Sequence, residues 1–388
     1  MKISKITTFV ARVPLGEKQF LSSQLLFPER TSLLLKIETD DGLVGWGEGG
    51  QYGPAEPVAS CIDNVLGPRL VGEDPRPRGK IWNDLYALSR DFGQKGTYIE
   101  AISAIDIALW DITGKALGEP VCRLLGGPVR ETVPAYATGC YYQGDNYLDY
   151  RAALPQLQAE ARSYVESGFR ILKTKVGLLE IDQDLERIAA IRDAIGPETA
   201  LLVDANHAYN VPSAIRMGKG LERLDVRWFE EPVTPEDRDG YRRVRQALSL
   251  AITGGECEFT RFGFRDLITT GCVDVAQPDI CASGGLSEWQ KITALGETFG
   301  VWVVPHVWGS GVALATALHA VAALPLFPHT ANPIPLQNEP VVEFDRTHNP
   351  LRDDLLKQKF ELVDGRIAVP QGPGLGIDVQ EEVLAEYV

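Results

Sequence analysis

The sequence predicts an α/β barrel preceded by a smaller α+β domain. The chain has 388 residues, more than the ~250 that an α/β barrel usually occupies as one unit. From residue 133 onward, eight short apolar segments alternate with segments of helical periodicity. Such alternation indicates parallel strands, and eight strands close a (β/α)₈ barrel. An open doubly wound sheet is the alternative, but no glycine-rich dinucleotide loop follows the first of these strands.

The first part of the chain, residues 1–126, has a mixed pattern that is typical of an α+β domain. Strands are expected at residues 3–13, 32–40 and 43–49. The Asp40-Asp41-Gly42 sequence predicts a hairpin turn between the last two. These strands therefore indicate an antiparallel sheet in the N-terminal domain.

Two helical segments follow these strands. One is expected from about Glu56 to Ser89. The other covers residues 98–118, has apolar residues at helical spacing, and places Gly118 as a C-cap. Glycine and proline then interrupt the pattern, so we place the domain boundary near Gly127.

The second domain is predicted to span residues 127–354. Its expected strands are residues 133–139, 170–177, 200–206, 226–232, 250–256, 273–279, 301–307 and 340–345. The helical segments between them cover residues 161–168, 185–195, 213–224, 241–248, 264–271, 287–300 and 312–324. The remaining residues, 355–388, contain a short strand and a helical tail that we expect to pack back on the first domain.

Composition and charge exclude several classes of function. Hydrophobic residues make up 44% and the net charge is −15, so the chain can bury a large core but is repelled by a phosphate backbone. Nucleic-acid binding is therefore disfavoured. No apolar run approaches the ~20 residues of a membrane span, and residues 1–16 contain no apolar signal core. We expect a cytoplasmic protein without a membrane association.

The six cysteines are scattered and form no C-x-x-C pair. This distribution favours reduced thiols over a zinc site or a disulfide framework. Only five histidines occur, so a histidine that carries chemistry should be identifiable from its position.

Ionisable residues follow the predicted barrel strands, at the ends where barrel active sites lie. The strand ends after the first carry Lys173, Lys175, Asp204, Glu230, Glu256, Asp279, His306 and Glu343. Buried charges are costly unless they are paired or bind a cation. The pattern therefore predicts an active site at this end of the barrel.

Three of these groups are carboxylates on adjacent strands. Asp204, Glu230 and Glu256 are spaced 26 residues apart, one strand–helix unit each. Oxygen-only ligands at the same height suit a hard cation such as Mg²⁺, which leaves positions open for substrate. The alternative is that arginines pair with the three carboxylates. We expect Glu231 to point away from the trio and to have a supporting or structural role.

Two lysines and a histidine–aspartate pair are the acid/base candidates. Lys173 and Lys175 lie on one face of their strand, and a cationic neighbour plus a metal would lower a lysine pKa enough for a general base. Lys173 could instead bind a substrate carboxylate, and simple ion pairing is the alternative for both. Asp279 would fix the tautomer of His306, giving a second acid/base group.

Other titratable groups receive weaker assignments. Glu343 could bind a substrate carboxylate if it is protonated, with a salt bridge at the barrel rim as the alternative. His319 lies in an apolar helical segment and is expected to be a satisfied core residue. His329 and His348 are expected in loops, and His207 could belong to the site or to its surroundings.

The order of these motifs resembles the enolase superfamily in its mandelate racemase subgroup. The matching segments are KTKVG, VDANHAY, FEEP, GGE, QPD and VVPHVWGSG, together with the helix AISAIDIALWDITGKALGEPVCRLLGG and PGLGID near the C-terminus. The resemblance covers essentially the whole chain. It implies a (β/α)₇β barrel with an N-terminal α+β capping domain that the C-terminal tail completes.

The resemblance also implies roles for individual residues. Mg²⁺, one per subunit, would be held by Asp204, Glu230 and Glu256. Lys175 and the His306–Asp279 pair would be opposed acid/base groups. Asn206 would contact the bound substrate, and Glu343 matches an additional glutamate of the subgroup. A small-molecule carboxylate is the implied substrate, and a homo-oligomer is expected.

Within the subgroup, ATG in the first strand, DANHAY and EFDRTHNPLR resemble the galactarolactone cycloisomerase branch. That branch removes the proton α to a carboxylate of a sugar-diacid lactone and expels the ring oxygen, which gives a 3-deoxy-2-keto diacid. The segment NPIPLQNEPVVEFD, residues 332–345, departs from that branch and is expected to border the substrate.

Specificity is expected to lie in the capping domain. The residues expected to contact the substrate there are the loop 21–29 and the stretch 46–52, which includes Trp46. Tyr141 and Tyr142, after the first barrel strand, could complete the wall, with domain packing as the alternative.

Three further functions remain open from the sequence. A sugar-acid dehydratase and a racemase or epimerase share the proton abstraction and differ in the group at the β-carbon. A catalytically silent metal-binding barrel is the alternative that is not an enzyme, although such a scaffold would not need two acid/base groups.

Overall fold

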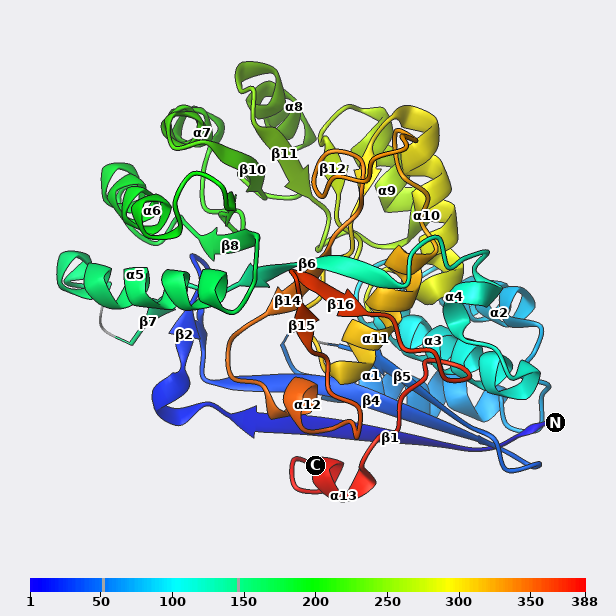
Figure 1. Ribbon diagram of the computed structural model, residues 1–388. Coiled ribbons are helices and arrows are strands. Elements are labelled where there is room, and N and C mark those ends of the chain that lie inside the picture. Colours follow the sequence, from blue (N-terminus) through cyan, green and yellow to red (C-terminus); the bar gives the residue numbers. More distant parts are fainter. Residues whose placement is uncertain (51–52, 145–146) are drawn as a thin grey trace.

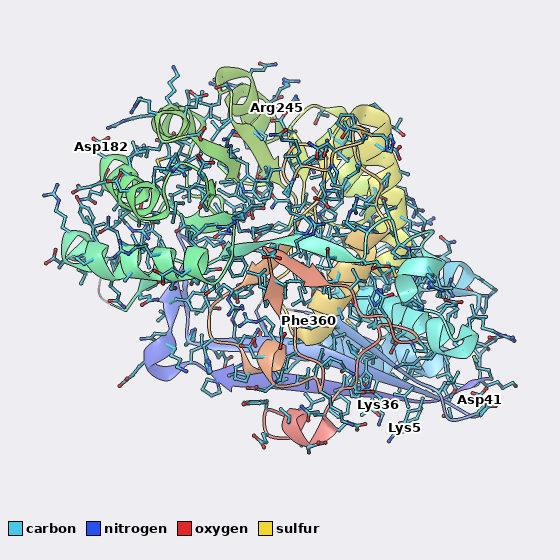
Figure 2. All side chains as sticks on the ribbon, in the orientation of Figure 1. Lys5, Lys36, Asp41, Asp182, Arg245 and Phe360 are labelled. Atoms are coloured by element: carbon cyan, nitrogen blue, oxygen red, sulfur yellow. The ribbon has the colours of Figure 1, made fainter. Side chains whose placement is uncertain are left out.

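The computed structural model describes residues 1–50, 53–144 and 147–388. Figure 1 shows a sheet-and-helix domain, in blue and cyan, lying against a ring of strands and helices that is built from the rest of the chain. The charged side chains labelled in Figure 2, such as Asp182 and Arg245, lie at the periphery. None of the described helices is long and apolar enough to cross a membrane.

The capping domain contains the expected antiparallel sheet. Its strands, in the order β1-β4-β5, are β1 (Ile3–Pro14), β4 (Glu29–Thr39) and β5 (Val44–Gly49). Helix α3 (Thr97–Leu117) crosses β5, and a Cβ at Gly45 or Gly47 would lie 2.3 or 2.0 Å from a carbonyl oxygen of that helix. Glycine is therefore required here because the helix backbone approaches the strand so closely. Gly118 ends α3 in the left-handed conformation, which confirms the predicted C-cap.

The helical segment predicted from Glu56 to Ser89 is not one helix. It consists of α1 (Glu56–Cys61), a π-helical turn η2 (Ile62–Leu66), a 3₁₀ turn η3 (Gly67–Arg69) and α2 (Arg78–Ser89). Residues 70–77, which contain Pro75 and Pro77, are not helical. Proline lacks the backbone N–H and disfavours helix in the residue before it, so the prediction of a continuous helix was wrong.

All eight predicted barrel strands are present, and neighbouring ones pair in parallel. They are β6 (Thr132–Thr138), β8 (Ile171–Lys175), β9 (Ala200–Asp204), β10 (Val226–Glu230), β11 (Ala251–Gly254), β12 (Val275–Ala276), β13 (Trp302–Val303) and β14 (Val342–Asp345). The sheet order is β13-β12-β11-β10-β9-β8-β6, and β14 pairs with β6.

Seven helices connect these strands and form the outer layer of the barrel (Figure 1). They are α5 (Tyr150–Glu166), α6 (Ile181–Ile195), α7 (Val211–Arg223), α8 (Arg238–Ala247), α9 (Thr260–Thr269), α10 (Gly285–Phe299) and α11 (Gly311–Ala322). Among the described residues, no helix of this outer layer follows β14. The fold is therefore the (β/α)₇β barrel with a capping domain.

Shorter elements join the two parts. They are η1 (Gly16–Lys18), β2 (Phe20–Leu21), β3 (Leu26–Phe27), α4 (Val121–Leu124), β7 (Tyr142–Gln143), α12 (Pro350–Asp353), β15 (Leu362–Val363), β16 (Arg366–Ala368) and α13 (Glu381–Leu384). The β2–β3 hairpin of the cap extends over the barrel, where β2 pairs with β7.

The C-terminal segment contacts both parts of the molecule. β16 adds antiparallel to barrel strand β6. Further on, α13 lies beside β1 and β4 (Figure 1), where Glu381 pairs with Lys36 at 2.6 Å; Figure 2 labels this lysine. The carbonyl of Tyr387 accepts a hydrogen bond from the backbone N–H of Arg12 at 2.7 Å. The tail thus packs on the cap sheet as expected, and its β15–β16 hairpin also extends the barrel.

Candidate active site

The barrel interior is built in two layers that differ by two residues along each strand. The lower layer is apolar and consists of Tyr136, Ile171, Leu202, Trp228, Val275, Val304 and Val341. Two residues further along the same strands, or just beyond their ends, stand Thr138, Lys173, Asp204, Glu230, Gln277, His306 and Glu343. Because side chains two apart on a strand share a face, the polar set lies above the apolar set, at the carboxyl ends of the strands.

Three carboxylates gather in the upper layer as the sequence predicted. Asp204, Glu230 and Glu256 each offer one oxygen within 4.8 Å of the other two. All three side chains are buried, and Oε2 of Glu256 has no hydrogen-bond donor among the described residues. A buried carboxylate oxygen without a donor is costly unless a cation compensates it. The trio therefore fits a hard, oxygen-binding metal ion.

Both predicted lysines are buried and paired with these carboxylates. Nζ of Lys173 lies 2.9 Å from Oε1 of Glu230 and 2.9 Å from Oε1 of Glu343. Nζ of Lys175 pairs with Oδ2 of Asp204. Lys173 is 1% exposed and holds Glu230 and Glu343 together, whereas Lys175 also lines the cavity described below.

The charges of this layer shift each other's pKa. Burial alone would raise the pKa of Asp204, but Lys175 and Lys173 outweigh it and lower that pKa to about 2. Burial, together with the charge of Asp204, raises the pKa of Glu230 well above its usual value. Burial and Glu231 raise the pKa of Glu256 to about 7. Burial and mutual repulsion therefore oppose the simultaneous ionisation of all three carboxylates. A bound cation would offset both effects.

The lysine pKa differs from the sequence expectation. Burial lowers the pKa of Lys175, as does Lys173, but the charges of Asp204 and Tyr141 outweigh both and raise it above the ordinary value. A neighbouring lysine and a metal were expected to lower the pKa of Lys175. The direct ion pair between Lys175 and Asp204, which the strand pattern does not show, raises it. A neutral lysine therefore requires that the charge of Asp204 be shared with a cation.

The histidine–aspartate pair is formed. Nδ1 of His306 lies 2.8 Å from Oδ2 of Asp279, which directs Nε2 toward Glu256 at 3.5 Å and Glu343 at 3.9 Å. Burial lowers the pKa of His306, but Glu256 and the Asp279 hydrogen bond outweigh burial and raise it to about 10. Asp279 thus orients the ring.

Two polar residues of the upper layer were missed by the sequence analysis. Gln277 donates from Nε2 to Oε2 of Glu230 at 2.7 Å, and Thr138 donates to Oε1 of Glu343. Burial would raise the pKa of Glu343, but Lys173 and His306 lower it to about 2. The period-two pattern on β6 and β12 would have identified both residues, because each lies two positions after an apolar layer residue.

A cavity of about 400 Å³ opens above this layer. From the barrel, its wall includes Tyr141, Lys175, Asn206, Glu256, His306, Trp308 and Glu343. From the cap, its wall includes Arg12, Ser22, Thr31, Gly53, Pro54 and most of the segment Gln24–Glu29. The predicted loop 21–29 therefore covers the site, and the stretch 46–52 includes residues 51–52, which lie outside the described residues.

An aromatic group connects cap and barrel at this cavity. Phe20 lies 4.6 Å from Tyr141 and Phe27 lies 4.9 Å from Trp308, measured between ring centroids. Tyr141 is thus placed in the wall as expected. Trp308 was not singled out from the sequence, although it stands two residues after His306.

Two expected substrate contacts, Trp46 and Tyr142, do not line this cavity. Trp46 is buried and packs against Phe9 at 5.8 Å. It shares a face of β5 with Glu48, whose carboxylate accepts from the N–H of Ser310 at 2.8 Å. Tyr142 donates to Asp184 at 2.6 Å and stacks under Arg187. Both residues make packing or hydrogen-bond contacts within the protein, and their contact with substrate stays a prediction.

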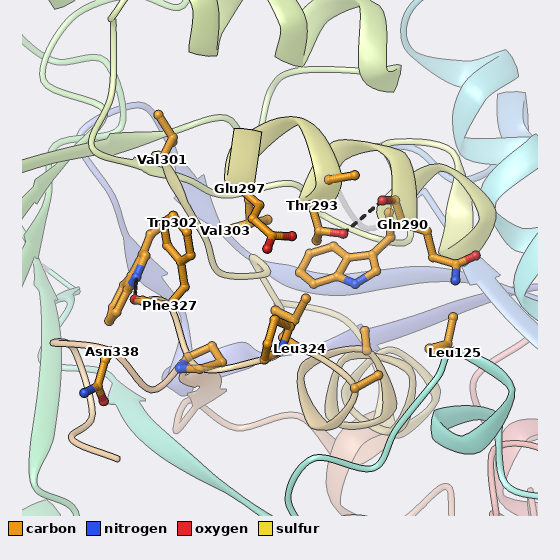
Figure 3. A pocket seen from close by; sticks show the side chains of 16 residues that line it. Leu125, Gln290, Thr293, Glu297, Val301, Trp302, Val303, Leu324, Phe327 and Asn338 are labelled. Carbon is orange, nitrogen blue, oxygen red and sulfur yellow. Dashed lines mark hydrogen bonds between the residues drawn. The ribbon is translucent and has the colours of Figure 1, made fainter. Parts of the chain in front are cut away.

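The segment 332–345 was expected to border the substrate. Its first part lies instead at the amino-terminal end of the barrel strands, where Leu336 packs against the apolar layer. Asn338 and Pro340 line a separate cavity of about 270 Å³, shown in Figure 3 with Trp302, Phe327 and Glu297. This part of the segment therefore lies at the end of the barrel opposite to the charged layer.

The four remaining histidines lie in three different environments. His319 accepts from the N–H of Cys122 at 3.2 Å and contacts the carbonyl of Leu375 at 3.0 Å, so it is a satisfied core residue. His329 and His348 are exposed in loops, as predicted. His207 lies beside Glu231, with 2.5 Å between Nε2 and Oε2, so Glu231 faces this histidine. Asn206 lines the cavity, as expected.

Comparison with known proteins identifies the family. Residues 6–126 match the mandelate racemase / muconate lactonizing enzyme N-terminal domain, and residues 156–383 match the enolase C-terminal domain-like family. The chain belongs to the enolase superfamily, in the group defined by these two domains. It is therefore an enzyme of the isomerase or lyase type.

Individual relatives agree with this assignment. The chain is 44% identical over 389 residues to the D-galactarolactone cycloisomerase of Agrobacterium fabrum, covering 100% of this chain and 99% of that protein. Other relatives, at 32–36% identity, are named dehydratases of arabinonate, D-galactonate and L-rhamnonate.

Solved structures are similar over the whole chain. The 3,6-anhydro-D-galactonate cycloisomerase of Zobellia galactanivorans has a TM-score of 0.88 and 43% identity, covering 100% of this chain and 99% of that one. A racemase of Streptomyces coelicolor A3(2), solved with bound magnesium, has a TM-score of 0.86 and 28% identity, covering 99% of each chain.

Proposed function

We propose that this enzyme removes the proton α to a carboxylate of a sugar-diacid lactone and then expels the ring oxygen, giving a 3-deoxy-2-keto diacid. The observation that carries the proposal is a three-carboxylate cluster flanked by two acid/base groups in one cavity. The similarity to a D-galactarolactone cycloisomerase supports the substrate class.

Asp204, Glu230 and Glu256 would hold one Mg²⁺ per subunit. When bound, Mg²⁺ supplies positive charge that stabilises the negative charge developing on the substrate carboxylate. Lys173 and Gln277 position this trio by holding the two oxygens of Glu230 at 2.9 and 2.7 Å. Because Lys173 is 1% exposed and pairs with both Glu230 and Glu343, its role would be to orient these two carboxylates. We assign Lys173 no direct contact with substrate.

His306 and Lys175 would act on the α-carbon from different sides. Lys175 ends β8 and His306 follows β13, and four strands, β9 to β12, separate these two in the sheet. Both side chains line the same cavity. We assign the removal of the α-proton to His306, because Asp279 fixes its ring and leaves Nε2 facing the cavity. The charge of Glu256 is the largest cause that raises the pKa of His306, and sharing that charge with a bound cation would lower this pKa and free Nε2 to accept a proton. Lys175 is then the partner that serves the second proton transfer.

The bond changes follow from the substrate. As the α-carbon loses its proton, its electron pair forms a double bond to the β-carbon, and the bond from the β-carbon to the ring oxygen breaks. The ring oxygen leaves as part of a new carboxylate. The resulting enol gains a proton at the former β-carbon and loses its hydroxyl proton, which gives the 2-keto acid. Asn206, in the cavity wall, would bind the substrate carboxylate. Glu343 also lines the cavity, but its pKa of about 2 keeps it ionised, so it would accept a hydrogen bond from a substrate hydroxyl.

Specificity would come from the segment Gln24–Glu29 and from the aromatic wall of Tyr141 and Trp308. The cavity volume of about 400 Å³ suits a six-carbon acid and closes to bulk water when the cap covers it. A homo-oligomer remains a prediction.

The experiment is incubation with galactarolactone and Mg²⁺ in D₂O, followed by semicarbazide detection of 2-keto acids and by mass analysis of recovered substrate. A 2-keto acid formed from the lactone is the expected result. Deuterated substrate without keto acid would indicate a racemase. Keto acid formed only from open-chain sugar acids would indicate a dehydratase, and absence of turnover on a wide panel of acids and lactones would indicate a silent barrel.

A further inference from the structure

A second cluster of metal-binding side chains lies beside the carboxylate trio. His207, Glu231 and Cys257 each offer one ligand atom, and these atoms all lie within 4.8 Å of one another. Nε2 of His207 is 2.5 Å from Oε2 of Glu231 and 3.6 Å from Sγ of Cys257. We propose that these three residues form a separate binding site for a borderline-soft divalent ion such as Zn²⁺.

The backbone brings these side chains together at some cost. His207 and Glu231 both have positive φ, 67° and 43°, although neither is glycine. The N–H of His207 donates to the carbonyl of Glu231 at 2.8 Å, which holds the two segments side by side. Left-handed backbone at residues with large side chains is uncommon and is held where surrounding structure requires it. Here it turns His207 and Glu231 toward each other.

The buried carboxylate of Glu231 is the feature that indicates a bound ion. Its side chain is 1% exposed. Oε2 lies against Nε2 of His207, and Oε1 has no hydrogen-bond partner among the described residues. A buried carboxylate in this condition requires a positive charge nearby. A metal ion held between the carboxylate, the imidazole and the thiolate would supply that charge.

The donor set selects the kind of ion. One nitrogen, one oxygen and one sulfur ligand suit Zn²⁺ and exclude Mg²⁺, which prefers oxygen alone. Of the three ligands, His207 lines a cavity of about 420 Å³, whose wall also includes Asn206, Thr234 and Glu236. Water from this cavity can complete a tetrahedral site, and Cys257 is solvent-accessible.

The cap segment supports the same histidine from its other side. The amide nitrogen of Gln24 contacts Nδ1 of His207, which accepts in this orientation. Rotation of the amide by 180° would let its oxygen accept from Nδ1–H while Nε2 of His207 binds a metal. The neighbouring Ser23 donates to the carbonyl of Ala205 at 2.6 Å. A bound ion would therefore fix the histidine on which the substrate-covering cap segment rests.

The inference does not depend on the proposed reaction, because the site is defined by its own ligands and is tested without substrate. The protein is first saturated with Mg²⁺ to fill the carboxylate trio. Co²⁺ is then added as a spectroscopic probe, since a thiolate ligand gives a near-ultraviolet charge-transfer band that oxygen ligands alone do not. Zn²⁺ affinity is measured by competition with a chromophoric chelator.

The expected result is one thiolate-bound Co²⁺ per chain in the parent and in the control Cys61→Ser, whose thiol lies in the cap helix α1. The band should disappear in Cys257→Ser. Zn²⁺ affinity should fall at least about 100-fold in this variant, because loss of a residue that only hydrogen-bonds to a metal ligand already costs about 10–100-fold. Gln24→Ala should weaken Zn²⁺ binding about tenfold.

A second variant keeps the test decisive if Cys257→Ser is unstable. His207→Asn retains a residue that tolerates left-handed backbone and should also lose the band. The band should persist in Glu230→Gln, because the trio is a separate site. Absence of a thiolate band in the parent, or Zn²⁺ affinity in Cys257→Ser and His207→Asn within about threefold of the parent, would overturn the proposal.

Discussion

The two ends of the barrel interior are equally buried and opposite in chemistry. On β9, Leu202 in the lower layer and Asp204 in the upper layer are both 0% exposed. On β10, Trp228 and Glu230 repeat the same step from apolar to charged. Each strand therefore changes from core to site within two residues.

The difference separates stability from function. Burying the apolar layer stabilises the fold, by about 1.5–3 kcal/mol for each large side chain. Burying the charged layer costs desolvation, and the raised pKa of Glu230, caused by burial and by the charge of Asp204, reflects that cost. A costly charged layer directly above a stabilising one is explained by chemistry performed there. Substitutions in the two layers should consequently have different effects.

The largest expected effect is that of metal removal. Exhaustive treatment with EDTA, with residual metal verified as nil, should lower turnover at least about 10³-fold, because positioned positive charge at developing negative charge is a major catalytic contribution. Mg²⁺ should restore it. Thermal unfolding should remain cooperative without metal, since the apolar layer lies below the site. Full activity of the metal-free protein would contradict the assignment.

In the lower layer, Leu202→Ala should reduce the free energy of unfolding by about 3 kcal/mol, within the usual range for a buried leucine. Turnover and Mg²⁺ affinity at low temperature should stay within about threefold of the parent. Leu202→Met, which conserves volume, should cost less than about 1.5 kcal/mol. Denaturant titration measures both, and a large loss of Mg²⁺ affinity without a loss of stability would remove the distinction between the layers.

In the upper layer, Glu230→Gln should show the reverse pattern. Mg²⁺ affinity should fall about 10²-fold or more, as one carboxylate ligand is lost. The free energy of unfolding without metal should not fall, because the substitution relieves a desolvated charge next to Asp204. Calorimetric Mg²⁺ titration and urea unfolding provide the two readouts. Unchanged Mg²⁺ affinity would show that Glu230 is not a ligand.

A smaller effect is expected for Asp106, a buried carboxylate outside the charged layer. It lies on α3 and accepts from the N–H of Ser287 on α10 at 2.8 Å. Burial raises its pKa from 3.8 to about 6. The folded state therefore binds the proton more tightly than the unfolded state, so this group's stability contribution grows as pH falls from about 6 to about 4 and is lost above about 6.

Asp106→Asn should remove this pH dependence. We expect a gain of about 1 kcal/mol near pH 8 and little change near pH 4, measured by thermal unfolding at both values. Catalytic parameters should not change, because Asp106 is not in the cavity wall. Equal shifts in Tm at both pH values would show that its charge does not determine the effect.

Much of the charged layer could be predicted from the sequence. The 26-residue spacing of Asp204, Glu230 and Glu256 identifies equivalent positions on successive strands, and the period of two places Lys173 and Lys175 on one face. These are local rules, and they hold because strand geometry is regular. The same rules would have found Gln277.

Contacts across the chain could not be predicted in this way. Gln24 meets His207 over a separation of 183 residues, which depends on how the cap lies on the barrel. The sequence also does not show which face of β5 carries Trp46. Segment 332–345 begins at the amino-terminal end of the barrel and ends in β14, and its sequence gave no indication of that direction.

The central claim is that His306 and Lys175, held in the charged layer on different sides of one cavity, perform the proton transfers. The most direct measurement is α-proton exchange of galactarolactone in D₂O, alongside product formation, in His306→Asn and Lys175→Ala. We predict that His306→Asn loses exchange and turnover at least about 10²-fold, and that Lys175→Ala stops net reaction while exchange persists. Turnover of both variants within about threefold of the parent would contradict the account.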